Sequence, residues 1–234
     1  MSFISFIKKI FRNHYYLLTA FLLPLSFPTF DFIIFKFFPV VAFVSFIPLF
    51  HKLRGVKGFR EIFRITFITG LISSFFMYSW MGAFGAGAPM GRVIVIAALV
   101  PALAGVFTLQ ASVSEILSRK NPKFRILIFS AIWLLFDLIK SLGYISFPWN
   151  YMGYSQYPFT WLIQISSITG VFGVTAVVIS VNLLLTEIVF LRGRIVSGKK
   201  FSSAQLMHFT PYLAIFSALI VFGAIRTNFK TSQK

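Results

Sequence analysis

The stretch that decides the fold lies in the second half of the chain and reads SAIWLLFDLIK at 130–140, FPW at 147–149, GYSQ at 153–156 and GVFG at 170–173. Asp137 and Lys140 stand three positions apart in an otherwise apolar helix and therefore share one of its faces. Ionisable residues are costly inside such helices, where they mark a bundle interior or the path of a substrate. The stretch predicts an all-α bundle of membrane helices.

The composition of the whole chain points the same way. Of its 234 residues, 58% are hydrophobic and 12% are charged, whereas soluble proteins carry roughly 25% charged residues. A soluble core of this size cannot hide so much apolar surface. The net charge of +17 would suggest a nucleic-acid partner in a soluble chain, but basic loops explain it in a membrane protein. We therefore expect a polytopic membrane protein and no nucleic-acid partner.

Apolar segments of roughly 17–25 residues are the unit that crosses a membrane. The first two segments are short and separated only by Pro28–Asp31, which is typical of a tight helical hairpin. One transmembrane domain is expected over 1–230, with a polar tail at 231–234 and no soluble domain. Seven spans are predicted, at 15–30, 32–50, 62–82, 92–117, 124–145, 160–190 and 209–226; the sixth is too long for one straight crossing, and glycines interrupt it.

Basic residues alternate between the two sides of this predicted bundle. Sixteen of the 22 Lys and Arg residues fall in the N-terminal segment and in the connections at 51–64, 118–125 and 191–200, and six fall on the other side. Because Lys and Arg accumulate in cytoplasmic loops, the N-terminus is predicted to be cytoplasmic. Seven crossings then place the C-terminus on the opposite side of the membrane.

The residues alone leave two interpretations of Asp137 and Lys140 open. The pair either orients a polar headgroup or is a structural ion pair whose charged end reaches the membrane surface. The following loop at 143–160 is uncharged and rich in aromatic residues, prolines and amides. Because a loop at membrane depth must be buried against protein or line a cavity, we expect it to fold into the mouth of the bundle. Trp149 and Tyr154 would then line an apolar lateral opening that suits a lipid.

Groups fit for catalysis are not evident. The chain has no cysteine and therefore offers neither a thiolate nucleophile nor a thiolate metal site. Its three histidines are isolated, and the serines in the spans have no base at a helical spacing. Glu115 and Glu187 are expected near the cytoplasmic ends of their helices, and Glu61 in a loop ion pair. No catalytic residue, metal or cofactor is predicted.

In order and spacing, the motifs resemble those of the membrane half of the bacterial apolipoprotein N-acyltransferase family. That family shows Glu-x-x-Arg on the helix where this chain has Asp137 and Lys140, and the resemblance is specific over about 130–182. The matching segments are FPTF at 27–30, SFPW at 146–149, GYSQ at 153–156, Gly170-x-x-Gly173 and VN at 181–182.

The resemblance implies a function in the bacterial inner membrane. The family transfers an acyl chain from a phospholipid to the N-terminal cysteine of a diacylated lipoprotein, so these two molecules are the expected partners. It implies seven helices followed by a periplasmic nitrilase-like domain with a Glu-Lys-Cys triad, and then an eighth helix. The expected substrate-binding residues are Asp137, Lys140, Pro148, Trp149, Gly153, Tyr154, Gln156 and Gln164.

Three interpretations of the function follow, because these 234 residues lack the cysteine nucleophile and the catalytic domain. The chain is the membrane part of a split or truncated enzyme whose nitrilase-like partner is a separate polypeptide, or it is a catalytically inactive module that binds lipid or lipoprotein. The third interpretation is a small transporter, although the sequence shows neither the internal repeat nor the paired broken helices typical of that class.

Overall fold

The structure is a computed structural model that describes residues 13–27, 38–85, 89–143, 146–196 and 210–231. Within these ranges the chain is helical and contains no β-strand, which confirms the all-α fold class. Short 3₁₀ segments lie at Tyr15–Leu17 (η1), Pro39–Phe43 (η2), Ser79–Gly85 (η3), Pro122–Phe124 (η4) and Met152–Gln156 (η5). The described α-helices are α2 (Leu18–Leu25), α3 (Ile47–Gly55), α4 (Phe59–Tyr78), α5 (Pro89–Ser118), α6 (Arg125–Ser141), α7 (Thr160–Ile163), α8 (Ser166–Val196) and α10 (Thr210–Thr231).

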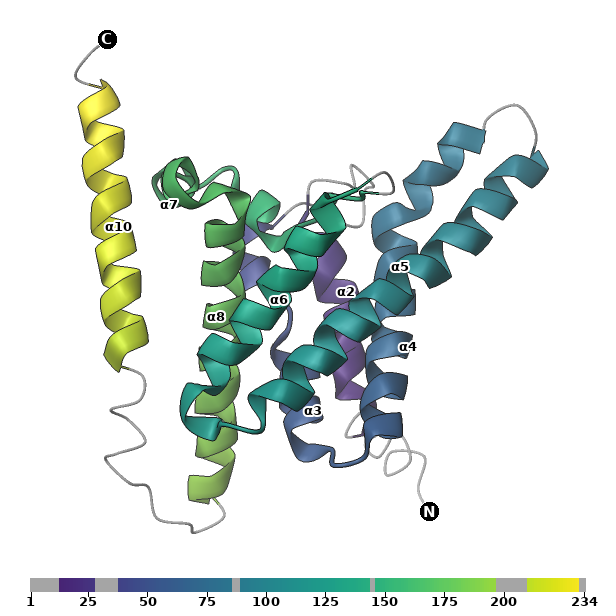
Figure 1. Ribbon diagram of the computed structural model, residues 1–234, viewed down its shortest axis with the longest axis horizontal. Coiled ribbons are helices and arrows are strands. Elements are labelled where there is room, and N and C mark those ends of the chain that lie inside the picture. The colour runs from purple at the N-terminus through teal and green to yellow at the C-terminus, as the bar shows by residue number, and fades with distance from the viewer. Residues whose placement is uncertain (1–12, 28–37, 86–88, 144–145, 197–209, 232–234) are drawn as a thin grey trace.

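Long helices that run up and down in alternation form the body of the bundle (Figure 1). α4 packs along α5, α5 on α6, and α6 on α8, while α3 packs against α8. The upper halves of α4 and α5 diverge from the other helices, and α10 stands at the opposite edge beside α7. Each end of the bundle therefore gathers side chains from helices that are distant in the sequence.

Within the described ranges, four helices are long and apolar enough to cross a membrane, at Phe59–Gly82, Met90–Ser118, Ser166–Arg192 and Thr210–Thr227. They match the third, fourth, sixth and seventh predicted spans. α6 matches the fifth span but has 17 residues, some of them charged. The first span corresponds to a short apolar helix at Tyr15–Leu25. A multi-pass membrane protein is thus supported, whereas the count of seven spans is not confirmed.

The second predicted span, 32–50, is not one helix where the structure describes it. η2 ends at Phe43, a turn follows, and α3 begins at Ile47. The first residues of this span, and the predicted turn at Pro28–Asp31, lie outside the described residues.

Side chains from other helices hold the backbone between η2 and α3. Asn182 on α8 accepts a hydrogen bond from the amide of Phe46 at 2.9 Å and donates one to the carbonyl of Ala42 at 2.7 Å. Thr19 on α2 accepts a hydrogen bond from the amide of Leu49 at 3.1 Å. Backbone that leaves the helical ladder at membrane depth needs such partners. Asn182 therefore fixes this broken segment against α8.

Buried aromatic side chains fill the space between α3 and α6. The rings of Phe46 and Phe50 stack with their centroids 5.0 Å apart, and Phe50 meets Phe129 of α6 edge-on at 4.7 Å. Trp133, one turn further along α6, lies edge-on to Phe46 at 5.1 Å. Aromatic pairs in these geometries add to the free energy gained by burial. They fix the rotation of α6 and so the direction in which its next turn, with Asp137, faces.

α8 is broken near its start, as its glycines predicted. Gly170 has φ +64° and ψ −168°, a backbone conformation essentially restricted to glycine.

At the other edge of the bundle, α10 continues to Thr231, so the first residue of the polar tail predicted at 231–234 is helical. Residues 232–234 lie outside the described residues. Gly223 allows α10 to approach α7, because a Cβ there would collide with the carbonyl oxygen of Trp161.

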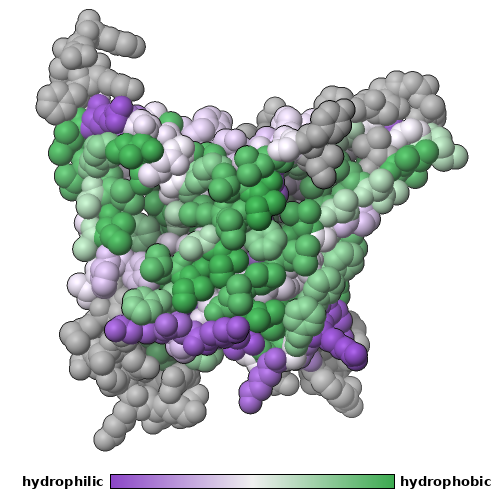
Figure 2. All heavy atoms as spheres, viewed as in Figure 1, coloured by the Kyte–Doolittle hydropathy of each residue, from purple (hydrophilic) through white to green (hydrophobic). Residues whose placement is uncertain are grey.

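The basic connections at 51–64 and 118–125 share one end of the bundle. Arg119, which follows α5, donates hydrogen bonds to the carbonyls of Leu53 and Val56, at the end of α3 and just beyond it. Arg54 of α3 pairs with Glu187 in the C-terminal half of α8. Figure 2 shows hydrophilic side chains along the lower edge, below a hydrophobic band. This common end agrees with the charge alternation predicted from the sequence.

Candidate functional site

Three polar side chains meet near the upper end of the bundle, inside apolar surroundings. The side chain of Asp137 is 2% exposed, and its Oδ1 lies 2.6 Å from Nζ of Lys140. The same oxygen accepts a hydrogen bond from Nε2 of Gln110 on α5 at 2.8 Å, and Oε1 of Gln110 accepts one from Lys140 at 3.2 Å. The three side chains form a closed ring that joins α5 to α6. The other carboxylate oxygen, Oδ2, is buried without a partner among the described residues.

A cavity of about 70 Å³ lies against this ring. Gln110, Asp137 and Lys140 give it one polar side, and the remaining walls come from α2, the turn before α3, α4, α5, α6 and the loop after α6. A volume of this size holds a few water molecules and is too small for an acyl chain. The cavity therefore suits a small polar group, whereas the sequence predicted an apolar opening.

The loop after α6 closes over the cavity. The hydroxyl of Tyr151 donates a hydrogen bond to the backbone carbonyl of Asp137 at 2.9 Å. Burial, together with the nearby Asp137 carboxylate, raises the pKa of Tyr151 to about 12, so this hydroxyl stays protonated and keeps donating. Trp149 lines the cavity and packs against Trp80, with ring centroids 5.5 Å apart. Asn150, which stands between Trp149 and Tyr151 in the chain, has φ +57°, a value that asparagine tolerates better than most residues.

The GYSQ segment docks this loop on the bundle. The amide of Gly153 donates to Oγ1 of Thr175 on α8 at 2.9 Å, and a Cβ at position 153 would lie 2.6 Å from the carbonyl oxygen of Val171. Gln156 is fully buried, and its Nε2 donates to the carbonyl of Pro39 at 3.0 Å. Glycine and glutamine at these positions allow the loop to lie directly on α8 and η2.

The eight substrate-binding residues predicted from the sequence separate into two groups. Asp137, Lys140 and Trp149 line the cavity, whereas the other five do not. Pro148 is exposed beside Trp149, Gly153 and Gln156 dock the loop, Tyr154 stacks on Tyr151 with its ring half exposed, and Gln164 donates to the carbonyl of Thr160 in its own turn.

Gln110 is not among the residues predicted from the sequence, although a signal for it existed. It is the one amide side chain in the predicted span at 92–117. Polar side chains inside membrane helices usually bond to a neighbouring helix. The sequence could therefore have marked Gln110 as a residue with a partner, but it could not have identified that partner as Asp137.

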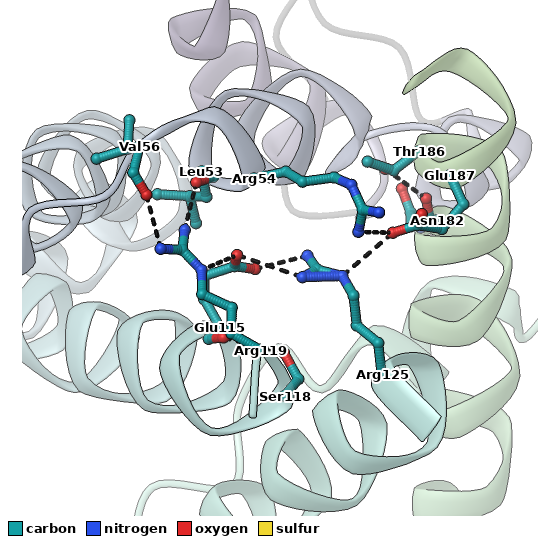
Figure 3. A network of polar contacts seen from close by, with 10 residues as sticks. All are labelled: Leu53, Arg54, Val56, Glu115, Ser118, Arg119, Arg125, Asn182, Thr186 and Glu187. Carbon is teal, nitrogen blue, oxygen red and sulfur yellow. Dashed lines mark hydrogen bonds and ion pairs between the residues drawn. The ribbon is translucent and has the colours of Figure 1, made fainter. Parts of the chain in front are cut away.

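A second polar cluster lies at the basic end of the bundle, where side chains from four helices converge (Figure 3). The carboxylate of Glu115 on α5 is fully buried and pairs with Arg119 and with Arg125 of α6, each at 2.7 Å. Arg125 also lies 3.1 Å from Glu187 of α8, which in turn pairs with Arg54 of α3. The position of both glutamates at this end was predicted from the sequence, but their pairing with arginines of other helices was not.

Among the residues that the structure describes, Glu61 does not form the loop ion pair predicted for it. Glu61 lies exposed in the first turn of α4, and no described basic group comes within ion-pair distance of it. An acidic side chain at a helix N-terminus is stabilised there by the helix dipole. Its position is therefore explained without a partner.

The chemistry available at the upper site is binding and orientation. Asp137 can accept a further hydrogen bond through Oδ2, and Lys140 carries a positive charge beside it. Ser73, in the cavity wall, donates to the carbonyl of Gly70 and is not paired with a base. In the described part of the chain, no three His, Asp or Glu side chains are grouped so that they could hold a metal ion.

Fold and site together define a helical membrane domain with a buried acid–base pair beneath an aromatic loop. The chain belongs to the apolipoprotein N-acyltransferase family, because the profile of the apolipoprotein N-acyltransferase N-terminal domain matches residues 19–184. This confirms the resemblance of the motifs.

Curated relatives agree with this family assignment. The apolipoprotein N-acyltransferase 1 of Treponema denticola is 26% identical over 187 residues, which cover 80% of this chain and 33% of that protein. The Geobacter metallireducens apolipoprotein N-acyltransferase is 29% identical over 175 residues, or 74% of this chain and 32% of the relative. The Rickettsia prowazekii apolipoprotein N-acyltransferase is 32% identical over 109 residues, which cover 47% of this chain and 20% of that protein. The chain thus spans a third or less of the length of these relatives.

Proposed function

We propose that this chain is the membrane part of a lipoprotein N-acylation system of the bacterial inner membrane, and that it binds phospholipid and diacylated lipoprotein. Acyl transfer then depends on a nitrilase-like catalytic part outside these 234 residues, which contain no cysteine. The observation that carries the proposal is the ion pair between buried Asp137 and partly exposed Lys140, at a cavity beneath Trp149 in a chain of this family.

In this proposal the headgroup and the acyl chains of a lipid occupy two different surfaces. The polar cavity is sized for part of a headgroup, whose hydroxyl or ammonium would satisfy the unpartnered Oδ2 of Asp137. Acyl chains fit an apolar groove of about 340 Å³ between α4 and α5, lined by Leu71, Ile72, Phe75, Ile96, Ala97, Val100 and Pro101. Concave sites with apolar walls and a few placed polar groups are typical of small-molecule binding.

The chain by itself is expected to bind these ligands but not to transfer an acyl chain. Through the family's mechanism, transfer needs a thiolate, a base that activates it and a donor for the oxyanion, and this chain has no cysteine. The test supplies a phospholipid donor and a diacylated lipopeptide to the purified chain, with and without a separately expressed nitrilase-like protein. Turnover by the chain alone would refute the proposed division of labour.

Two tryptophans provide a matched pair of variants for the binding measurement. Trp149, which lines the cavity, is 50% exposed, and Trp161, which does not, is 37% exposed. We expect Trp149→Ala to weaken lipopeptide binding about tenfold, because the variant loses part of the apolar area that the bound lipopeptide would cover. Trp161→Ala should leave the binding unchanged. Equal effects of the two variants would count against this site. No binding by the unaltered chain would also count against it and would favour a transporter.

The proposed topology places the basic end in the cytoplasm. Because Lys and Arg are retained in cytoplasmic loops, the N-terminus is expected there and Lys234 on the periplasmic side. Alkaline phosphatase fused after Lys234 should be active in intact cells, and green fluorescent protein at the same position should be dark. The reverse pattern would contradict the combination of a cytoplasmic N-terminus with an odd number of crossings.

A further inference from the structure

A second pocket lies at the basic end of the bundle, away from the site proposed above. It has a volume of about 310 Å³ and is lined by side chains that include Arg54, Lys57, Glu115, Arg119, Arg125 and Phe190. Figure 3 shows Arg119 and Arg125 directed toward Glu115, and Arg54 of α3 directed toward Glu187 of α8. The pocket therefore lies against the ion-pair network at the basic end of the bundle.

Positive charge is in excess at this pocket. The described cations are Arg54, Lys57, Arg119 and Arg125, and the acidic groups paired with them are Glu115 and Glu187. Two positive charges thus have no counter-charge among the described residues. Because uncompensated charge is costly at a partly buried site, an anion bound here would be stabilised.

The hydrogen-bond donors of the pocket that remain available belong to Arg54 and Lys57. Arg119 uses all its guanidinium nitrogens on Glu115 and two backbone carbonyls, and Arg125 uses all of its own on Glu115 and Glu187. Nε of Arg54, in contrast, is buried without a partner among the described residues. Lys57 is exposed at the mouth, and its ammonium forms no ion pair within the described part of the chain.

We propose that this pocket binds the phosphate group of an anionic ligand through Arg54 and Lys57. Guanidinium and ammonium groups bind phosphate by charge-assisted hydrogen bonds, and basic pockets between helices at a membrane surface bind lipid headgroups. The ring of Phe190, whose centroid lies 4.4 Å from the Arg54 guanidinium carbon, gives the pocket an apolar side that fits the start of an acyl chain. An anionic phospholipid and a free phosphate ester share this chemistry, and the experiment distinguishes them.

The test uses the purified full chain and native mass spectrometry, with phosphatidylglycerol and phosphatidylcholine of the same acyl chains as probes. The unaltered chain should retain phosphatidylglycerol preferentially. Lys57→Gln should weaken that retention about fivefold, and Lys57→Glu about 25-fold, because each basic group near a lipid surface contributes about a factor of five. Lys120, exposed at the same end but outside the pocket, supplies the matched controls Lys120→Gln and Lys120→Glu, which should change nothing.

Each outcome decides the proposal. Retention of phosphatidylglycerol that falls in the Lys57 variants and not in the Lys120 variants supports the pocket. If millimolar inorganic phosphate does not release the lipid, the pocket is assigned to a lipid headgroup. Release by inorganic phosphate at that concentration assigns it to a free phosphate ester. Equal retention of the two lipids with no effect of inorganic phosphate, or equal losses in the Lys57 and Lys120 variants, would overturn it. None of these measurements involves lipoprotein, so they stand or fall separately from the proposed N-acylation function.

Discussion

Replacing Glu115 by glutamine is expected to lower the free energy of unfolding by about 3–5 kcal/mol, the usual cost of breaking a buried ion pair from one side. The Glu115 carboxylate is fully buried, and Arg125, which it holds, has a side chain only 6% exposed. Without the carboxylate, Arg125 keeps one acidic partner, Glu187, and Arg119 keeps only two backbone carbonyls. Thermal unfolding of the purified protein in one detergent measures the loss.

Glu61→Gln is the matched control for this substitution. Glu61 is exposed on α4, so its replacement should change the stability by no more than about 0.5 kcal/mol. If the two variants unfold at the same temperature, the network does not hold α3, α5, α6 and α8 together. If Glu115→Gln unfolds well below Glu61→Gln, the basic end of the bundle depends on this carboxylate.

The second large effect is expected at the opposite end of the bundle. Asp137→Asn leaves the shape of the side chain intact but leaves the ammonium of Lys140 without its counter-charge, 2.6 Å away. We expect a loss of about 2 kcal/mol, below the usual range for a buried pair because Lys140 is 22% exposed and water screens part of its charge. Binding of the diacylated lipopeptide should weaken as well, since the unpartnered Oδ2 of Asp137 is replaced or reoriented.

A double-mutant cycle separates the ion pair from the individual side chains. Asp137→Asn with Lys140→Gln removes both charges, so no unpaired charge remains and part of the lost stability should return. Additive losses in the double variant would show that the two residues act independently. Recovery of stability without recovery of lipopeptide binding would indicate that the pair both holds α6 and takes part in the site.

Much of the architecture could be predicted from local features. Composition alone indicated a membrane protein, because 58% hydrophobic residues leave no soluble alternative. The break in α8 at Gly170 followed from a glycine whose backbone conformation other residues cannot adopt. The motifs between 130 and 182 indicated the family, and the alternation of basic connections indicated that they share one end. These features depend on residue type and spacing along the chain, which the sequence states directly.

Contacts between helices were decided by the tertiary structure. Gln110 and Asp137 are 27 positions apart, and Arg54 and Glu187 are 133 apart, so no local pattern relates them. Their meeting depends on the rotation and depth of each helix, which the packing of Phe46, Phe50 and Phe129 helps to fix. For the same reason the sequence predicted a second continuous span, whereas hydrogen bonds from Asn182 stabilise a broken one. The sequence by itself determined which segments are apolar and which residues carry charge; the partners of the buried charges were set by side-chain packing between helices remote in the chain.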